Sequence, residues 1–269
     1  ILLECITFRM RGHEEASGTK YVPKKLMDEW AKKDPIENFE KFLLKEKVID
    51  QNHVESLRKK IKKEIEVALE VAITETHPVA DTQNELDDVY APYSQTVIGP
   101  SEKKTEKRFI DAISEGLSQS MEKHPNLVLM GQDIADYGGV FKITEGFVEK
   151  FGKDRVRNTP LCEAAILGSA LGLSIKGMKA MVEMQFADFA TEGFNQIINN
   201  LAKTHWRWGQ PVDVIVRMPT GAGTAAGPFH SQSNEAWFFH TPGLKIVYPS
   251  NPYDAKGLLC AAFEDPNPY

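Results

Sequence analysis

The chain has 269 residues and a mass of 30.2 kDa, with 42% hydrophobic and 26% charged residues. This composition is typical of a globular protein and excludes disorder as the main state. The formal net charge of −6, without a dense basic tract, argues against nucleic-acid binding. The longest nearly apolar run, residues 164–175, is shorter than the roughly 20 residues of a membrane span. Three scattered cysteines argue against a disulfide framework and favour the cytoplasm.

The first part of the sequence is expected to be mainly helical. Residues 2–8 are apolar and predict a buried strand; because the chain begins without Met or a basic leader, we expect it to be the middle of a longer polypeptide. Apolar periodicity predicts helices over residues 24–32 and 35–46, and a long helix over residues 53–74 with lysines on its other face. Residues 76–104 contain three prolines and no sustained period, which predicts a linker.

From residue 105 onward the pattern alternates between helix and strand. Buried strands that alternate with helices indicate an α/β fold with a doubly wound parallel sheet. Side chains that follow the strands should then gather at one edge of the sheet, where ligands bind. The expected strands are residues 127–134, 155–159, 179–186, 212–218 and 244–249. The expected helices are residues 109–123, 163–175, 191–206, 234–240 and 253–264.

Reactive side chains follow three of these strands. Glu163 comes after the strand at 155–159. The strand at 179–186 leads to Gln185, Asp188 and Phe189, and His230 ends the loop after the strand at 212–218. A carboxylate, an aromatic ring and an imidazole at one edge of a sheet suit acid–base chemistry. Structural roles stay open as well: Glu163 also suits the positive end of a helix dipole, Phe189 also suits a core, and His230 also suits a loop before the capping residue Ser231.

In the first segment, Arg9 and His13 leave the expected strand and enter a polar loop. Both side chains can bind a phosphate, arginine through its forked guanidinium and histidine through one ring nitrogen. The alternative is ordinary surface charge, because Glu14 and Glu15 follow directly.

Taken together, these segments resemble the thiamine-diphosphate-dependent decarboxylase component of 2-oxo acid dehydrogenase complexes. TFRMRGH (residues 7–13) resembles the end of the diphosphate-binding domain of the alpha subunit of this component. Five further segments resemble the pyrimidine-binding domain of the beta subunit. They are GQDIADYGGVFKITEGF, FGKDRVRNTPLCEAA, VEMQFADF, FHSQSNEAWFFHTPGLKIVYPSNPYDAKGLL and EDPNP. The resemblance implies an alpha–beta fusion. Residues 1–75 would form the C-terminal part of the diphosphate-binding domain, residues 76–104 a linker, and residues 105–269 a pyrimidine-binding domain that is incomplete at its C-terminus.

The resemblance also implies roles at the matching positions. Glu163 matches the carboxylate that hydrogen-bonds the aminopyrimidine ring of thiamine diphosphate, and His230 matches the histidine that moves a proton during acyl transfer to a lipoyl group. The pyrimidine pocket is expected to be lined by Leu161, Gln185 and Phe189.

Phosphate and metal contacts are implied in the same way. Arg9 and His13 match the pair that holds the diphosphate. Asp265 and Asn267 match a potassium site. The motif that binds magnesium is absent from these residues, so its ligands are expected upstream of this sequence.

The activity implied is oxidative decarboxylation of a 2-oxo acid, with transfer of the acyl group to the lipoyl domain of an acyltransferase partner. A homodimer of the fused chain is expected. NTPLCE, QFADF and HSQS favour a branched-chain substrate such as 3-methyl-2-oxobutanoate, and pyruvate is the second candidate. The sequence also leaves open an enzyme of transketolase type and a non-catalytic assembly module.

Two residues depart from the family pattern. Gln132 stands where the family usually has glutamate, which puts a proton relay through that position in doubt. Glu14 stands where animal relatives carry a phosphorylatable serine, so control by phosphate addition is not expected at that position.

Overall fold

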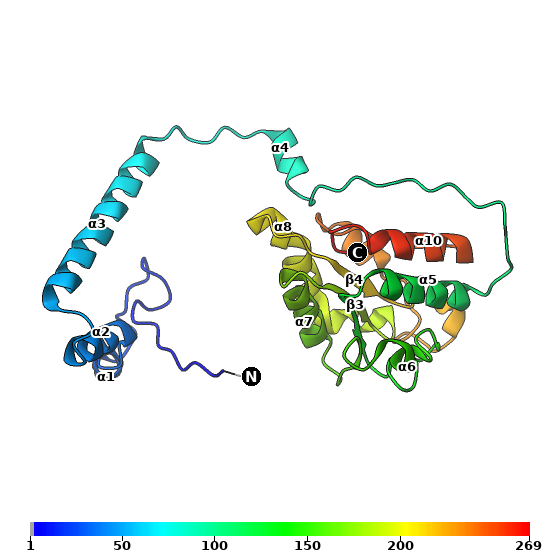
Figure 1. Ribbon diagram of the computed structural model, residues 1–269, viewed down its shortest axis with the longest axis horizontal. Coiled ribbons are helices and arrows are strands. Elements are labelled where there is room, and N and C mark those ends of the chain that lie inside the picture. Colours follow the sequence, from blue (N-terminus) through cyan, green and yellow to red (C-terminus); the bar gives the residue numbers. More distant parts are fainter. Residues whose placement is uncertain (1–2) are drawn as a thin grey trace. The chain divides into compact units, whose positions relative to one another are not determined.

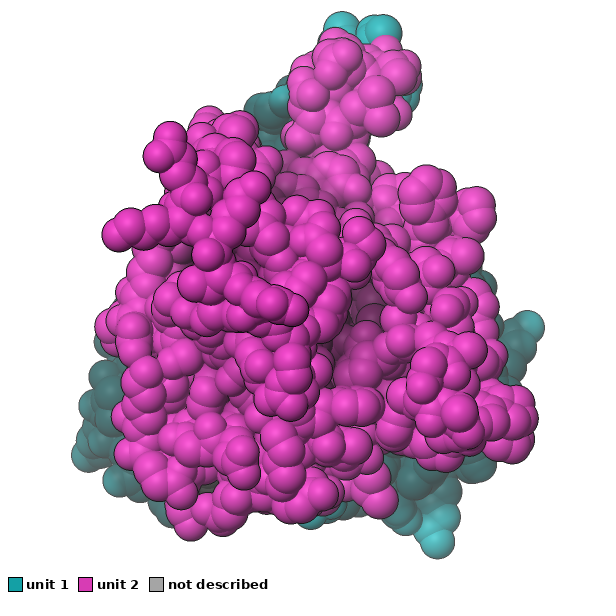
Figure 2. Space-filling view, turned by 90° about the vertical axis from the view of Figure 1, so that its right-hand side faces the viewer, with its two compact units in different colours: residues 1–79 teal, residues 80–269 magenta. Residues whose placement is uncertain are grey.

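The computed structural model describes residues 3–269 and forms two compact units, one within residues 1–79 and one formed by residues 80–269 (Figure 2). The first unit holds the helices α1 (Lys24–Ala31), α2 (Pro35–Lys45) and α3 (Gln51–Thr74), close to the positions expected from the apolar periodicity (Figure 1). Asp34 and Asp50 cap α2 and α3, because their carboxylates accept hydrogen bonds from backbone N–H groups of the first turn.

The strand expected over residues 2–8 is wrong for the residues that the structure describes. Residues 3–8 form no strand, and Leu3 and Ile6 are 81% and 77% exposed. Residue 2 lies outside the described residues. A strand requires a neighbour that satisfies its backbone N–H and C=O groups, and residues 3–79 contain no strand that could be that neighbour.

The second unit is built on a four-stranded parallel sheet. Its strands are β1 (Leu127–Gly131), β2 (Val156–Asn158), β3 (Lys179–Glu183) and β4 (Val214–Arg217), in the order β2-β1-β3-β4. Every pairing is parallel. The predicted α/β class with a parallel sheet is therefore confirmed.

Helices cover both faces of this sheet. The helix α7 (Glu163–Ile175) packs on one face, while α5 (Phe109–Lys123) and α10 (Pro252–Ala262) lie side by side on the other (Figure 1). Alternate strand residues point to opposite faces. The core on the α7 side includes Val128, Met130, Ala180, Val182 and Val214. The core on the α5 side includes Leu127, Leu129, Met181 and Ile215.

The remaining helices are short. They are α4 (Thr82–Asp87), α6 (Phe147–Phe151), α8 (Ala202–Trp208) and α9 (Glu235–Phe239). The single helix expected over residues 191–206 is instead a succession of a 3₁₀ helix (Ala187–Gly193), a π-helical segment (Gln196–Leu201) and α8. Helix α6 has no counterpart among the elements expected from the sequence. No helix within residues 3–269 is long and apolar enough to cross a membrane.

The strand expected over residues 244–249 is also wrong, because the chain end takes the place beside β4. Tyr269 N donates to Val214 O at 3.0 Å, and Val216 N donates to Tyr269 O at 2.8 Å. Lys245 N bonds Pro268 O at 2.9 Å instead of β4. Residues 266–269 therefore lie between β4 and Lys245, and residues 244–249 cannot join the sheet.

The segment expected to be a linker is partly ordered on the second unit. It contains α4, and Ala91 is 4% exposed. Ala91 N donates to Asn267 Oδ1 at 2.7 Å, and Asn267 Nδ2 donates to Ala91 O at 3.0 Å. These two bonds attach the segment to the end of the second unit.

Candidate functional site

The carboxyl edge of the sheet brings together residues that follow β1 and β2. Gln132 directly follows β1, and Glu163 is the first residue of α7. Gln132 Nε2 donates to Glu163 Oε1 at 3.0 Å. Gln132 is buried and Glu163 is half-buried. The protein thus holds one carboxylate oxygen, and the N-terminus of α7 favours the negative charge there.

Polar atoms beside this pair are left without protein partners. The buried Gln132 Oε1 has no hydrogen-bond partner within residues 3–269. No hydrogen bond in that part of the chain engages Glu163 Oε2 either. A buried amide oxygen without a partner costs free energy, so a donor from outside these residues would stabilise it.

The end of β3 contributes Gln185. Its Nε2 lies 3.4 Å from Asp133 Oδ2, a long hydrogen bond that links the segments after β3 and β1. Leu161, expected to line the same pocket, is 81% exposed. The structure therefore places Gln185 near the Gln132–Glu163 pair in the fold, and leaves Leu161 at the surface.

The loop after β4 places His230 against two phenylalanine rings that follow β3. The ring centroid of His230 lies 5.0 Å from that of Phe186 and 5.3 Å from that of Phe189. The interplanar angles are 85° and 79°, the edge-to-face arrangement that aromatic rings favour. Glu163 and His230 therefore both lie at the carboxyl edge of the sheet. Glu163 is bonded by Gln132 at the end of β1, and His230 contacts Phe186 after the end of the neighbouring strand β3.

Asp188 holds the loop that carries His230. Its Oδ1 accepts hydrogen bonds from Gln232 Nε2 at 2.8 Å and from Gln232 N at 3.4 Å. Gln232 O accepts from Thr220 Oγ1 at 2.7 Å and from Gly221 N at 3.1 Å. The sequence alone does not single out Gln232; its only signal is its place two residues after His230.

A buried ion pair joins the last residues of β3 and β4, directly before this edge of the sheet. Arg217 Nη1 donates to Glu183 Oε2 at 2.5 Å, and the side chains are 14% and 4% exposed. The two residues end the neighbouring strands β4 and β3 and pair directly in the sheet register. A buried pair of this kind must stay complete, because either charge alone would be expensive to bury.

The expected phosphate-binding pair lies in the first unit. Arg9 and His13 are both exposed, and Arg9 Nη2 donates a hydrogen bond to His13 O. The loop between them turns at Gly12, whose φ of +74° and close approach to Gly18 O exclude a side chain. The backbone of the loop thus orients Arg9 toward His13, with the rest of the guanidinium exposed.

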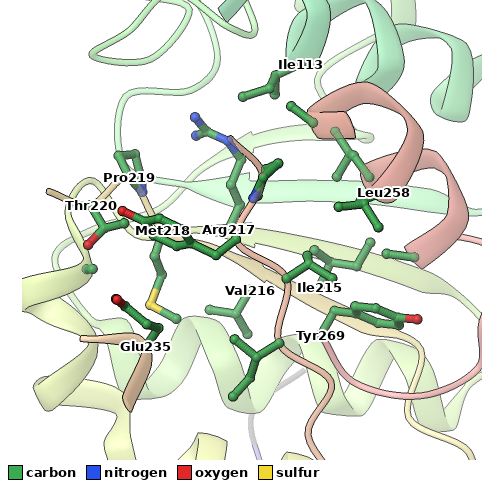
Figure 3. Close-up of a pocket in the computed structure, with 18 of the residues that line it drawn as sticks. Ile113, Ile215, Val216, Arg217, Met218, Pro219, Thr220, Glu235, Leu258 and Tyr269 are labelled. Carbon is green, nitrogen blue, oxygen red and sulfur yellow. The ribbon is translucent and has the colours of Figure 1, made fainter. Parts of the chain in front are cut away.

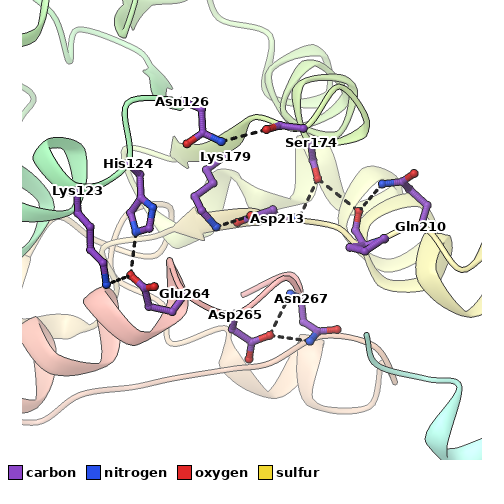
Figure 4. A network of polar contacts seen from close by, with 12 residues as sticks. Lys123, His124, Asn126, Ser174, Lys179, Gln210, Asp213, Glu264, Asp265 and Asn267 are labelled. Carbon is purple, nitrogen blue, oxygen red and sulfur yellow. Dashed lines mark hydrogen bonds and ion pairs between the residues drawn. The ribbon is translucent and has the colours of Figure 1, made fainter. Parts of the chain in front are cut away.

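Asp265 and Asn267, the expected potassium ligands, belong to a polar network near the amino ends of β3 and β4 (Figure 4). Asp265 Oδ2 accepts from Lys245 Nζ and from Tyr269 Oη, and its Oδ1 accepts from Asn267 Nδ2 at 2.6 Å. Asn267 Oδ1 is engaged by Ala91 N. These oxygens are already bonded and an ammonium group is present, so the residues do not fit a potassium ion.

Burial and hydrogen bonding compete in setting the pKa values of this network. Burial would raise the pKa of Asp265, but the bonds from Lys245, Asn267 and Tyr269 lower it overall. Burial raises the pKa of Asp213, although its partner Lys179 lies 2.5 Å away. Within residues 3–269 no group of three His, Cys, Asp or Glu side chains is arranged to hold a metal ion.

An apolar cavity of about 460 Å³ lies beside β4 (Figure 3). It is lined by aliphatic side chains of α5, β4 and α10, among them Ile113, Ile215 and Leu258. Glu163 and His230 do not line it. We place the candidate site at the carboxyl edge and not in this cavity, because the groups capable of acid–base chemistry gather at the edge.

The carboxyl-edge residues fit the aminopyrimidine ring that the sequence resemblance implies. Such a ring has polar nitrogen atoms on a flat aromatic body. Within residues 3–269, Glu163 Oε2 and Gln132 Oε1 have no hydrogen-bond partner, and Phe189 lies at the same edge of the sheet in edge-to-face contact with His230. Oxygens that accept hydrogen bonds, beside aromatic side chains, suit such a ring, whereas the described residues hold no group of three His, Cys, Asp or Glu side chains suited to a metal ion.

Two family models match the chain in tandem. The model described as "Dehydrogenase E1 component" matches residues 1–80, and the model described as "Transketolase, pyrimidine binding domain" matches residues 106–269. These matches confirm the resemblance expected from the motifs in both halves of the sequence.

Individual relatives match the second half. The chain is 48% identical over 164 residues to 2-oxoisovalerate dehydrogenase subunit beta of Bacillus subtilis, covering 60% of this chain and 50% of that protein. It is 43% identical to the mitochondrial 2-oxoisovalerate dehydrogenase subunit beta 2 of Arabidopsis thaliana, covering 64% and 49%. It is 44% identical to pyruvate dehydrogenase E1 component subunit beta of Acholeplasma laidlawii, covering 59% and 49%. The chain spans about half the length of these relatives.

Proposed function

Because this chain belongs to the transketolase pyrimidine-binding-domain family through residues 106–269, we propose that its carboxyl-edge site binds the aminopyrimidine ring of thiamine diphosphate. The protein then acts as the decarboxylase component of a 2-oxo acid dehydrogenase complex. The observation that carries this proposal is the Gln132–Glu163 pair, in which one carboxylate oxygen is fixed and the other has no partner within residues 3–269.

In this proposal Glu163 holds a proton at a ring nitrogen of the pyrimidine. Gln132 donates to Oε1, which leaves Oε2 to bond the ring. Thiamine diphosphate, when bound, supplies a thiazolium carbon that adds to the 2-oxo group and takes up the electrons released with carbon dioxide. A positioned acid–base group of this kind contributes about 10²–10⁴-fold to turnover.

The other edge residues orient the ligands. Phe189 packs against the pyrimidine ring, and Gln185 and Leu161 border it. His230 exchanges a proton with the lipoyl thiol or the acyl oxygen during acyl transfer. The exposed position of Leu161 is expected if another domain or a second copy of the chain closes the pocket from outside.

Arg9 and His13 hold the diphosphate in this proposal. An exposed guanidinium and imidazole suit two phosphate groups, because arginine binds phosphate oxygens in a bidentate manner. The match of residues 1–80 to the dehydrogenase E1 component model supports this assignment.

The proposed substrate is a branched-chain 2-oxo acid such as 3-methyl-2-oxobutanoate, and the proposed acyl acceptor is the lipoyl domain of the acyltransferase component. The names of the two 2-oxoisovalerate dehydrogenase relatives support this choice, and the pyruvate dehydrogenase relative supports pyruvate as the second candidate. The proposed assembly is a homodimer of the fused chain. Its location in the cytoplasm stays a prediction.

Substitution of Glu163 tests the proposal. In the intact protein, Glu163→Ala should lower decarboxylation at least about 100-fold, because it removes the proton-holding group. The matched control is Glu149→Ala, which removes an exposed first-turn glutamate from α6. Release of carbon dioxide from 3-methyl-2-oxobutanoate and from pyruvate, measured side by side, also decides between the two substrates.

Near-normal decarboxylation by Glu163→Ala would overturn the assignment. It would favour a purely structural role, in which Glu163 only stabilises the dipole of α7 and the chain serves assembly. Affinity for thiamine diphosphate, measured by calorimetry, gives a reading that does not depend on turnover. The substitution should weaken that affinity. The free energy of unfolding should stay within about 1 kcal/mol of that of the unsubstituted protein, as expected at a half-buried position.

A further inference from the structure

We propose that Asp188 is a positioning residue for His230, acting through Gln232. This inference rests on the proposed function, because it assigns Asp188 to the acyl-transfer step in which His230 takes part. The hydrogen bonds that the Asp188 side chain accepts come from Gln232 in the loop after β4, so its effect is exerted through that loop.

The contacts of Asp188 concentrate on one residue of that loop. Its Oδ1 accepts both the side-chain and the backbone N–H of Gln232. Gln232 O is bonded by Thr220 Oγ1 and Gly221 N at the beginning of the same loop. Both ends of the loop from residue 220 to residue 232 therefore meet at Gln232, and Asp188 fixes this junction to the segment after β3.

The same short segment also grips the imidazole. Phe186 and Phe189 lie on either side of Asp188 in the sequence, and both rings contact His230. Phe186 directly precedes the 3₁₀ helix from Ala187 to Gly193, and Asp188 and Phe189 lie in the first turn of that helix. Residues 186–189 thus contact the loop at two points: Phe186 and Phe189 contact the ring of His230, and Asp188 bonds Gln232 two residues later.

The environment of Asp188 makes the anchor strong. Asp188 is 8% exposed, and Oδ2 is buried without a partner within residues 3–269. The hydrogen bonds that Oδ1 accepts are therefore the main compensation for burying this carboxyl group. Loss of the carboxyl group frees Gln232, and His230 then samples positions away from the two rings.

The loop is further braced beside His230 itself. Thr224 Oγ1 donates to His230 O at 3.2 Å, and Ser231 Oγ accepts from Ala226 N at 3.1 Å. These bonds shape the loop locally, whereas the Asp188–Gln232 contacts and the bond from Ala187 N to Pro219 O at 2.8 Å tie it to the segment after β3. Of these two ties, the Asp188 contacts are the ones at the far end of the loop, two residues after His230. The position of His230 relative to the carboxyl edge thus depends on Asp188.

The test compares two half-reactions of the intact protein. Asp188→Ala should lower acylation of a lipoyl domain about tenfold or more relative to carbon dioxide release with an artificial electron acceptor, because only the former uses His230. Gln232→Ala should show the same imbalance. Asp188→Asn keeps an acceptor for Gln232 and should restore the ratio to within about threefold. Glu149→Ala is the control at an unrelated exposed carboxylate.

Epistasis and spectroscopy decide the outcome. In a His230→Asn background, Asp188→Ala should cause no additional loss of acyl transfer. The imidazole proton resonances of His230 should carry ring-current shifts that Asp188→Ala and Gln232→Ala abolish, whether or not cofactor is bound. Equal losses in both half-reactions, or an unchanged imidazole spectrum, would overturn the positioning role. Absence of decarboxylation in the unsubstituted protein would instead contradict the proposed function.

Discussion

At the scale of single residues, the carboxyl edge depends on side chains whose partners are far away in the sequence. Glu163 bonds Gln132, which precedes it by 31 residues, and Glu183 bonds Arg217, which follows it by 34 residues. Residue 132 carries an amide, whose Nε2 donates to Glu163 Oε1 at 3.0 Å. With an amide there, the pair is joined by an N–H donor and an acceptor, and no shared proton is needed.

Removal of one partner of the buried ion pair should cost more than removal of any surface pair. Arg217→Ala leaves the Glu183 carboxylate buried and unpaired, so the free energy of unfolding should fall by about 3–5 kcal/mol. In the same unit, Lys153→Ala breaks an exposed pair with Asp136 and should change the free energy of unfolding by less than about 0.5 kcal/mol. Denaturant titration measures both. Similar losses for the two variants would show that the buried pair is already compensated by water.

At the scale of elements, close contacts between backbone segments fix how the helices and loops lie on the sheet. Gly243 lies after α9, and a Cβ built on it would be 1.9 Å from Ala202 O at the start of α8. Its φ is +95°, a region that side chains disfavour. Two separate reasons, strain and contact with a backbone atom, thus require glycine at this position.

Two glycine substitutions separate these reasons. Gly209→Ala adds a methyl group at φ +67° in open space after α8, and should lower the free energy of unfolding by about 1–2 kcal/mol. Gly243→Ala adds the clash with Ala202 O to a similar strain, and should cost about 2–5 kcal/mol. Thermal and urea unfolding of the two variants compare them. Equal losses would mean that the chain relaxes easily around Gly243.

The final segment of the chain should make stability depend on pH. Hydrogen bonds lower the pKa of Asp265 below its ordinary value of about 3.9 in spite of burial. The stabilisation is therefore complete above about pH 4 and is lost as the pH falls through the lower pKa of the folded state. Asp265→Asn should lower the free energy of unfolding by about 1.5–3 kcal/mol at about pH 7.

The difference between the unsubstituted protein and Asp265→Asn should shrink as the pH falls below about 4. Denaturant titrations between about pH 3 and pH 7 measure this convergence. Asp213 contributes with the opposite sign, because burial raises its pKa, and its cost is relieved as the pH falls. A constant difference across the pH range would contradict the assignment of the effect to the charge on Asp265.

At the scale of the whole molecule, the chain consists of two compact units that differ in kind. The helices of the first unit bury few side chains, and apolar residues of α3 such as Ile61 and Ile65 are 46% and 61% exposed. The second unit has two hydrophobic cores, one on each face of its sheet. Between α4 and α5 the chain runs through exposed residues 92–107 without regular structure.

Limited proteolysis should follow this organisation. Trypsin should cut early after Lys103 and Lys104, which are exposed and lie in a stretch of sixteen residues without helix or strand, residues 92–107. Lys179 is the internal control, since it lies in β3 and pairs with Asp213 at 2.5 Å. Mass spectrometry of the early fragments identifies the order of cleavage. Cleavage after Lys179 at a similar rate would contradict the packing of the second unit.

The sequence by itself determined the elements whose signals are local. Apolar periodicity located α1, α2 and α3, and the alternation of helix and strand patterns located α5 and α7, because each helix forms its own backbone hydrogen bonds. The motifs also determined the family, and the alternation of strands and helices determined the parallel sheet.

Only the tertiary structure decided which strands are formed and which side chains meet. Residues 3–8 and 244–249 carry the composition of strands, yet a strand exists only where a neighbour accepts its hydrogen bonds, and a distant segment, residues 266–269, took the second position. The contacts of Asp188 with Gln232 and of Phe186 with His230 likewise join segments more than 40 residues apart. Local patterns contain no information about such pairs, because packing of the whole sheet brings them together.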